Sequence, residues 1–380
     1  NGTITPTTTA NTSITTTTGK NTTLNYSKNS PLDTSNMFTQ TDLTQTVDTT
    51  NAKKITLEDG KDVTIDAAGT YVITGTAKNS TVIINASADA EVHLVFDNVS
   101  ITNTNKPTVC AVNAKNVYVT TTQNSTNNLK VTGEFTEDDG NDIDAVIFAK
   151  TNITLNGLGT LNIDSSANGI ASNSDLKVTG GTYNVNTTKH GFKALNSIRV
   201  ADGTFNINAT KDGFHSENED DLTTGYVYIA GGNFTINSED DGIQGTSITE
   251  IDGGTFAINA VEGIEGTYVQ INDGTIKIYA TDDGINASEK ATNYDVQLEI
   301  NGGNLDITMA EGDTDALDAN GTLTINGGYI NITAQFAFDF DLTASLNGGT
   351  VIVNGTQVTS ITNSMMEGGG GPGGFGGPQH

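Results

Sequence analysis

One short motif recurs through the second half of the chain and constrains its fold more than any other feature. Each copy has a turn ending in glycine, followed by alternating polar and apolar residues, as in GGTYNVN at 180–186 and GGTFAIN at 253–259. The second glycines of successive copies are 20 to 29 residues apart, and the shorter spacings lie close to 22. A period of this length indicates a solenoid, in which each repeat stacks on its neighbour. The eight copies begin at residues 180, 202, 231, 253, 273, 302, 327 and 348.

Each repeat contains three short runs, such as TFNINA, DGFHS and GYVYIA between residues 204 and 230. Period-two alternation bounded by glycine and asparagine is typical of β-strands. Three strands in a turn of about 22 residues predict an all-β fold, a single-stranded parallel β-helix, and parallel crossovers favour the right-handed form.

Composition divides the chain into three parts. Residues 1–35 are rich in Thr and Asn with little apolar content, and we expect a disordered linker. Residues 36–366 carry the strand pattern and form the predicted β-helix domain, whereas 367–380 are rich in Gly and Pro and predict a flexible tail.

A second phrase, an acid or His followed by glycine and an apolar residue, lies between the first and second strands of each repeat. We expect its glycine to turn the corner, where a positive φ suits glycine alone. The next residue then points inward, so these apolar side chains form an interior ladder: Phe192, Phe214, Ile243, Ile264, Ile285 and Leu317.

The residues before the corner glycine form a predominantly acidic column if the coils stack in register. Adjacent strands lie about 4.8 Å apart, and two carboxylates at that distance repel by roughly 1 kcal/mol in water and about 3–4 kcal/mol at an effective dielectric near 20. Calcium takes six to eight oxygen ligands in adaptable geometry and suits such a column. The alternative is a row of solvated corner acids screened by salt. The predicted calcium ligands are Asp212, Asp240, Asp241, Glu262, Asp282, Asp283 and Asp315.

The same register gathers much of the scarce positive charge on two adjacent coils. We interpret this patch as a substrate-binding site for an anion such as a sugar carboxylate; the alternative is local neutralisation of nearby acids. Its residues are Lys189, His190, Lys193, Lys211 and His215.

Two longer repeats carry insertions at 217–225 and 288–295, both between the second and third strands. They are three coils apart, so we expect loops about 14 Å from each other on one edge, framing the acids like walls of a cleft. Nearby tyrosines offer rings for sugar stacking: Tyr226, Tyr228, Tyr268, Tyr279 and Tyr294.

Charge excludes one large class of partner. The formal net charge is −28 and Arg199 is the only arginine, so nucleic-acid binding, which needs clustered basic residues, is not expected. No apolar run of about 18 residues occurs, so no membrane-spanning segment is predicted. We expect an extracellular or cell-surface protein, acting as a monomer.

Several segments outside the repeats resemble a known family. They are MFTQTDLTQT at 37–46, GTYVITG at 69–75, ITLNGLGTLNI at 153–163 and MMEGGGGPGGFGGP at 365–378. Together with the repeats they look like the extracellular carbohydrate-binding domain family, formerly a domain of unknown function, whose fold is similar to that of pectate lyases. The resemblance implies calcium-dependent binding of plant cell-wall polysaccharide, such as acidic pectic sugars or cellulose.

Two functions from different classes therefore remain open. The first is non-catalytic polysaccharide binding, with no catalytic residues. The second is a calcium-dependent pectate or polysaccharide lyase, which needs a base to remove the proton α to the uronate carboxylate; Lys189, Lys193 and Lys211 are the candidates. A structural spacer is a third interpretation, because any solenoid separates what lies at its ends.

Overall fold

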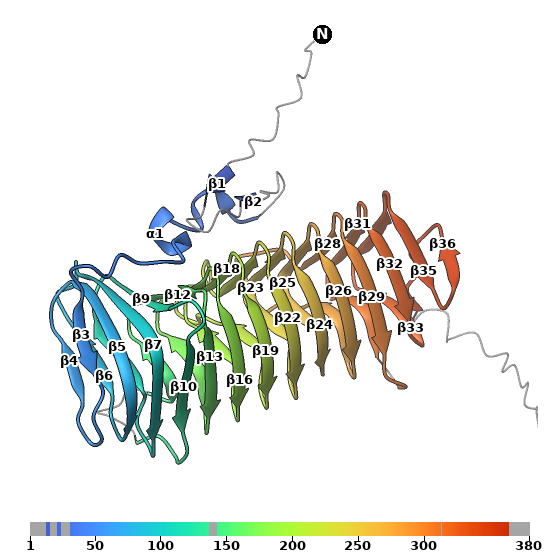
Figure 1. Ribbon diagram of the computed structural model, residues 1–380. Helices are drawn as coiled ribbons and strands as arrows, with labels where there is room; N and C mark the ends of the chain where they lie inside the picture. Colours follow the sequence, from blue (N-terminus) through green and yellow to red (C-terminus); the bar gives the residue numbers. More distant parts are fainter. Residues whose placement is uncertain (1–12, 16–20, 24–30, 137–142, 313, 365–380) are drawn as a thin grey trace, which may run out of the picture.

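A computed structural model of the protein describes the backbone of residues 13–15 and 21–23, and residues 31–136, 143–312 and 314–364 (Figure 1). Strands β3 to β36 belong to one continuous 34-stranded sheet that winds into an elongated solenoid. Nearly all strand pairs are parallel, and each coil bonds to the coils before and after it. The predicted parallel β-helix is confirmed.

Three faces run the length of the solenoid, and each coil contributes to all of them. The first sheet contains the glycine motif and consists of β10 (Thr126–Val131), β13 (Thr160–Ser165), β16 (Thr182–Thr187), β19 (Thr204–Ala209), β22 (Asn233–Ser238), β24 (Thr255–Ala260), β26 (Thr275–Ala280), β29 (Asn304–Met309), β32 (Tyr329–Thr333) and β35 (Thr350–Val353). The second sheet follows the corner glycine and consists of β4 (Val63–Ile65), β6 (Val82–Asn85), β8 (Val109–Asn113), β11 (Ala145–Ala149), β14 (Asn168–Ser172), β17 (Phe192–Ala194), β20 (Phe214–Ser216), β27 (Asp283–Ala287), β30 (Asp315–Ala319) and β33 (Phe336–Phe340).

The third sheet closes each coil and consists of β3 (Lys53–Thr56), β9 (Asn116–Thr121), β12 (Asn152–Gly157), β15 (Asp175–Val178), β18 (Ser197–Val200), β21 (Tyr226–Ile229), β28 (Gln297–Ile300), β31 (Thr322–Ile325) and β34 (Thr343–Leu346). Four longer strands pass through a corner and serve two sheets: β5 (Gly69–Lys78), β7 (Glu91–Asn103), β23 (Ile243–Ile251) and β25 (Ile264–Ile271). The remaining strands form antiparallel pairs, with β36 (Thr356–Val358) on β35 and β1 (Ser13–Thr15) on β2 (Asn21–Thr23).

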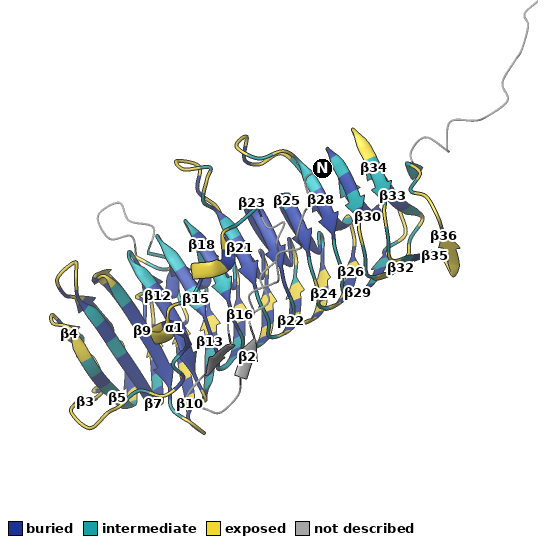
Figure 2. Cartoon of the chain, turned by 90° about the horizontal axis from the view of Figure 1, so that it is seen from above, coloured by how far each residue is buried: buried dark blue, intermediate teal, exposed yellow. Residues whose placement is uncertain are grey.

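The core is a set of ladders of identical or similar side chains, as the register predicts. Phe192 pairs with Phe214, and Phe214 with Ile243, so the corner residues stack in one file. The Phe192 and Phe214 rings are 4.8 Å apart and nearly parallel. A parallel file on the first sheet stacks Phe205 on Phe234 at 4.7 Å. All these side chains are buried, and in Figure 2 buried residues recur along the strands of the whole solenoid.

The corner glycines serve a different purpose from the predicted one. Positive φ belongs instead to the second glycine of the first-sheet motif, for example Gly203 at 148° and Gly254 at 114°. Gly213, before Phe214, is required for space: a Cβ there would lie 2.6 Å from the carbonyl oxygen of Gly242 on the next coil. The same close approach recurs between Gly242 and Gly263, so the acid–glycine phrase marks tight contact between coils.

Asparagine side chains tie the coils together outside the core. On the first sheet, Asn206 Nδ2 donates to Asn184 Oδ1 at 2.8 Å. At the turn after the third sheet a longer ladder runs from Asp252 through Asn272, Asn301, Asn326 and Asn347, with each Nδ2 donating to the preceding coil at 2.7–2.8 Å. Each amide satisfies its neighbour, which suits a stack of identical turns.

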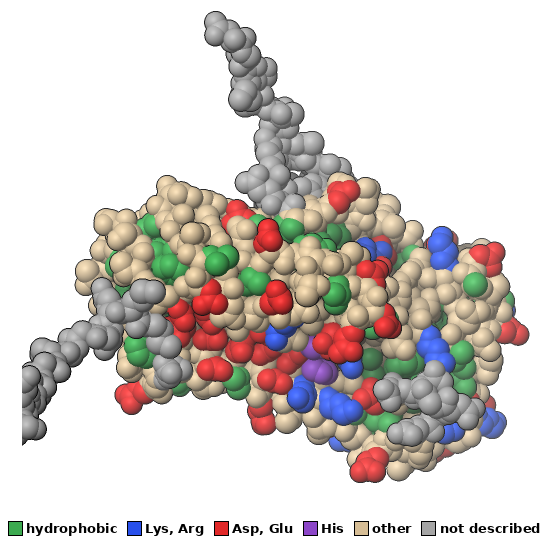
Figure 3. All heavy atoms as spheres, turned by 180° about the vertical axis from the view of Figure 1, so that it is seen from behind, with side chains coloured by type: hydrophobic (Ala, Val, Ile, Leu, Met, Phe, Trp, Pro, Cys, Tyr) green, Lys and Arg blue, Asp and Glu red, His purple; other side chains and the backbone are tan. Residues whose placement is uncertain are grey.

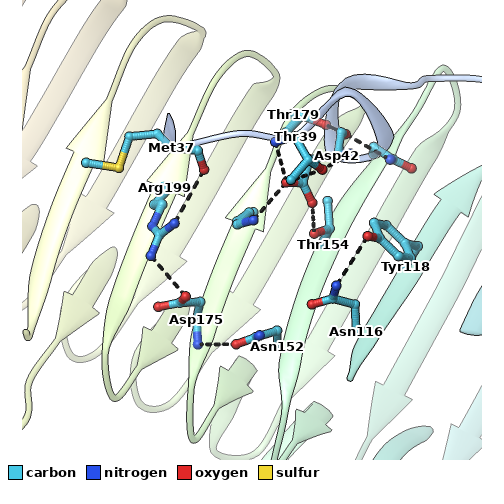
Figure 4. Close-up of polar contacts among 12 residues, drawn as sticks. Met37, Thr39, Asp42, Asn116, Tyr118, Asn152, Thr154, Asp175, Thr179 and Arg199 are labelled. Carbon is cyan, nitrogen blue, oxygen red and sulfur yellow. Dashed lines mark hydrogen bonds and ion pairs between the residues drawn. The ribbon is translucent and has the colours of Figure 1, made fainter. Parts of the chain in front are cut away.

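An N-terminal strap, residues 37–47, lies across the third sheet (Figures 1 and 4). The short helix η1 (Thr34–Asn36) precedes the strap. Within it lies one helical turn, α1 (Gln40–Leu43), capped by Thr39 and Asp42 in a reciprocal capping box. The buried Asp42 carboxylate accepts from Lys177 Nζ at 2.7 Å and from Thr154 Oγ1 at 2.8 Å. Gln45 bonds the backbone oxygen of Thr179 at 3.0 Å.

The described residues include part of the predicted terminal segments. Within 1–35 they comprise the short β1–β2 pair and residues 31–35, and the rest of that segment lies outside the described chain. The predicted tail at 367–380 also lies outside it, and the solenoid ends with the β35–β36 hairpin.

Candidate functional site

Two columns of polar side chains run along the outer face of the second sheet. The corner column holds the residues before the corner glycine, in the order His190, Asp212, Asp241, Glu262 and Asp283. Asp283 pairs in turn with Asp315 on the next coil. The second column lies three residues further along each strand and is fixed by strand pairing; it contains Lys193, His215, Gln244, Glu265, Asn286 and Asp318.

A shallow groove of about 340 Å³ lies over these columns, and Figure 3 shows a band of acids meeting a group of His and Lys side chains there. It brings together four of the five predicted substrate-binding residues, with Lys189 outside its lining, and four of the seven predicted metal ligands. Asp282, Asp283 and Asp315 lie outside its lining, towards the C-terminal coils. The lining residues are His190, Lys193, Lys211, Asp212, His215, Glu217, Asp240, Asp241, Gln244, Glu262, Glu265 and Lys290.

At the basic end, two histidines converge on one carboxylate. His215 Nδ1 lies 2.6 Å and His190 Nδ1 3.3 Å from the same Oδ2 of Asp212, and the two rings stack at 4.3 Å. Burial by itself lowers the pKa of His215, but hydrogen bonds to Asp212 and Glu217 outweigh it and raise the pKa to about 9. Burial lowers the pKa of His190. Burial by itself raises the pKa of Asp212, but the two histidines hold it well below its usual range.

At the acidic end, carboxylates crowd one another. Asp241, Glu262 and Glu265 bring ligand oxygens within 4.8 Å of one another, and so do Glu262, Asp282 and Asp283. Burial, followed by the charges of neighbouring acids, raises the pKa of Asp241 to about 10. The same causes raise the pKa of Glu262 to about 7.

Burial also raises the pKa of Asp283 to about 8, with Asp318, Glu262 and Asp282 adding to it. Raised values of this kind mean that negative charge is unfavourable here without a cation nearby. Asp315 lies further along the corner column and is not among the described groups of ligand oxygens that converge within 4.8 Å.

The lysines near the groove differ in their ion-pair partners. Lys189 pairs with Asp144 at 2.7 Å and Lys211 with Asp240 at 3.4 Å, both at the surface. Lys290, from the second inserted loop, pairs with the buried Glu265 at 2.8 Å. Among the ion pairs between described residues, Lys193 takes part in none, although it lines the groove.

The two inserted loops leave the same edge, as predicted, but they do not stand apart. Tyr294 Oη of the second loop donates to the backbone oxygen of Thr223 in the first at 3.2 Å, so the loops meet instead of leaving a gap of about 14 Å. Exposed loops project from this edge in Figure 2. Their contribution to the groove comes from Glu217 and Lys290, which lie near their starts.

Sequence reasoning missed four lining residues and misplaced the aromatic ones. Gln244 and Glu265 belong to the second column, which could have been found by continuing the Lys193–His215 register. Glu217 and Lys290 come from the insertions, where no repeat fixes a position. Tyr226, Tyr228 and Tyr268 lie on the third sheet, Tyr279 on the first and Tyr294 in a loop, so the predicted stacking rings are not part of the groove lining.

Arg199 is also remote from the groove. It lies on the third sheet, where it pairs with Asp175 at 2.9 Å and donates to the Met37 backbone oxygen of the strap (Figure 4). Across the described part of the chain, no helix has both the length and the apolar character needed to cross a bilayer.

Comparisons with known proteins agree with this architecture. A family model described as "Carbohydrate-binding domain-containing protein" matches residues 59–334 and 260–364. A protein of that description from Acetivibrio thermocellus is 31% identical over 124 residues, which is 32% of this chain and 43% of that relative's length. The solved structure of a polysaccharide lyase-like protein from C. thermocellum, a gadolinium derivative, superposes with a TM-score of 0.51 at 24% identity. The superposition covers 70% of this chain and the whole of that structure, and it shows a similar fold.

Proposed function

The chain belongs to the carbohydrate-binding domain-containing protein family, and from this premise we propose that it is a non-catalytic, extracellular or surface-attached protein that binds acidic plant cell-wall polysaccharide in the groove of the second sheet. One observation carries the proposal: the groove sets Lys and His side chains beside a row of crowded carboxylates. A polysaccharide with carboxylates can use both halves, the first directly and the second through a bridging cation.

Calcium is the cation that the donor set suits. The acidic end offers only oxygen ligands, from coils that stack about 4.8 Å apart. We place calcium at Glu262, Asp282 and Asp283, since no described cationic side chain pairs with these three. Glu265 is less suitable because Lys290 pairs with it. Gln244 Nε2 also bridges Asp241 and Glu265, whereas Glu262 accepts from the single amide of Asn286 at 3.0 Å. Asp212 is occupied by the two histidines.

Sedimentation with insoluble pectate tests the proposal. A protein at −28 should be repelled by a polyanion, so binding needs either calcium bridges or the basic patch. We expect binding with calcium, loss in chelator, and loss in Glu262→Gln/Asp283→Asn. The matched control is Asp164→Asn, an exposed acid on the first sheet that pairs with Lys130. Full binding in chelator that disappears in Lys189→Ala/Lys211→Ala would place the site in the basic patch instead.

A lyase is the second candidate, supported by Lys193. This side chain lines the groove and takes part in no ion pair between described residues, so its amino group is free to approach a sugar bound there. Mixing the protein with polygalacturonate and calcium decides between the two functions. Sustained growth of unsaturated-uronate absorbance that disappears in Lys193→Ala would establish the lyase, and its absence in a protein that still sediments with pectate supports binding alone.

A further inference from the structure

The basic end of the groove offers nitrogen ligands, which calcium does not favour. Two imidazoles and one carboxylate, from His190, His215 and Asp212, bring one ligand atom each within 4.8 Å of one another. Both Nδ1 atoms face the same Asp212 oxygen, at 3.3 and 2.6 Å. Imidazole nitrogen favours zinc, copper and nickel over calcium and magnesium.

The surroundings orient these atoms. The other carboxylate oxygen of Asp212, Oδ1, accepts the backbone N–H of Asp241 at 3.2 Å, which leaves Oδ2 for the two rings. His215 Nε2 lies 3.3 Å from Glu217 Oε2, so Nδ1 of that ring is turned towards Asp212. A carboxylate on the far nitrogen is the usual partner of a metal-bound histidine.

A simple ion pair explains only one of the two rings. His215 and Asp212 satisfy each other at 2.6 Å. His190 stacks on His215 and points Nδ1 at the same oxygen from 3.3 Å, an ion-pair distance without the geometry of a hydrogen bond. A cation between the three atoms would give the second imidazole a partner.

We propose that His190, His215 and Asp212 form a binding site for a borderline divalent metal of the zinc class, separate from the calcium ligands and held in place by Glu217. Three protein ligands leave a tetrahedral zinc ion one further position, and all three residues line the groove. A sugar hydroxyl or carboxylate in the groove can fill that position.

Zinc titration of the full chain, stripped with chelator and then saturated with calcium, tests the site. Calcium in excess fills the acidic end, so calorimetry with Zn²⁺ reports the remaining site. We expect one equivalent of tight binding, loss of that equivalent in His190→Gln, and roughly 10- to 100-fold weaker binding in Glu217→Gln. The control is His93→Gln, on the third sheet beside Tyr118, which should bind as the original chain does.

Two outcomes would overturn the proposal: no zinc uptake by the original chain, or the same uptake by His190→Gln. His190→Gln also removes the stack on His215 and the contact with Asp212, so the melting temperature of the metal-free variant is measured beside the titration, and an unchanged value shows that the variant is folded. Cobalt gives a second readout, since Co²⁺ in a four-coordinate site absorbs visible light much more strongly than in a six-coordinate one. If calcium still raises the melting temperature of His190→Gln while zinc binding is lost, the zinc site and the calcium site are independent.

Discussion

Phe214 illustrates how single residues hold the coils together, since its ring is fully buried between Phe192 and Ile243. Phe214→Ala removes packing on both neighbouring coils and should lower the free energy of unfolding by about 3–5 kcal/mol. Urea denaturation measures it. Leu342→Ala, at a position 72% exposed, serves as the control and should change little. A loss below about 1 kcal/mol for Phe214→Ala would show that neighbouring coils collapse into the space.

Gly213 tests whether space or conformation fixes the corner glycines. Gly213→Ala puts a Cβ 2.6 Å from the Gly242 carbonyl oxygen and 2.7 Å from Ile236 Cγ2, so the coils must separate. We expect destabilisation of about 1–3 kcal/mol, typical of overpacking. At Gly60, φ is +70° and nothing lies within 4 Å, so Gly60→Asn should be tolerated. The two melting temperatures distinguish the causes, and equal shifts would contradict the steric account.

Sequence alone could predict the file of apolar residues after the corner glycine, because the period fixes the register. It could not reveal why Gly213 is glycine, since the clash is with a backbone atom 29 residues away in sequence. The position of Glu265 could have been predicted from the same register. Lys290 was not, because a loop has no repeat to place it, and its pairing with Glu265 depends on the loop's own fold.

Among the elements, the N-terminal strap is held by contacts that the sequence repeats do not predict. Gln45 and Thr179 are 134 residues apart, and the strap is anchored by Asp42 against Lys177. The sequence marked this stretch only through family resemblance, and predicted neither its turn of helix nor its place on the third sheet. The strands, by contrast, were predictable because their pattern repeats eight times.

Asp42→Asn should release the strap while the solenoid stays folded. Burial by itself raises the pKa of Asp42, but the hydrogen bond and charge of Lys177 outweigh it, so its pKa is lowered. Its stabilising effect is therefore present above the ordinary value of 3.8 and is lost as the pH falls below it. We expect faster hydrogen exchange and proteolysis at residues 37–47 in the variant and, at pH 3, in the original chain. Asp48→Asn, an exposed acid bonded to Thr50, is the control; equal protection in both variants would contradict the role of Asp42.

For the whole molecule, the acidic end of the groove predicts how stability depends on pH. Asp241, Glu262 and Asp283 have folded-state pKa values raised to about 10, 7 and 8. Protonation of these groups favours the folded state, so their contribution is complete below their ordinary values near 4 and is lost as the pH rises through 7 to 10.

In chelator, the melting temperature should therefore fall between pH 5 and 9, and calcium should restore it most at the alkaline end, because an ion bound only to the folded state stabilises it by mass action. Differential scanning fluorimetry across this range measures both effects. Glu262→Gln/Asp283→Asn should flatten the chelator profile and reduce the calcium response. Identical melting curves with calcium and with chelator at every pH, and no metal by elemental analysis, would rule out the calcium site.

The hydrogen bonds of the asparagine ladder at the turn after the third sheet all run in one direction along the solenoid. An amide can face either way along the stack, and Asn272 turns its Nδ2 towards two acceptors, Oδ1 of Asp252 at 2.7 Å and Oε1 of Gln270 at 3.0 Å. The Oδ1 of Asn272 then accepts from Asn301 Nδ2. In the same way Asn301 accepts from Asn326, and Asn326 accepts from Asn347. Acceptors beside the stack, Gln270 at Asn272 and Glu299 at Asn326, favour the same direction. The four amide dipoles therefore point the same way over successive coils, and the ladder has a polarity along the solenoid.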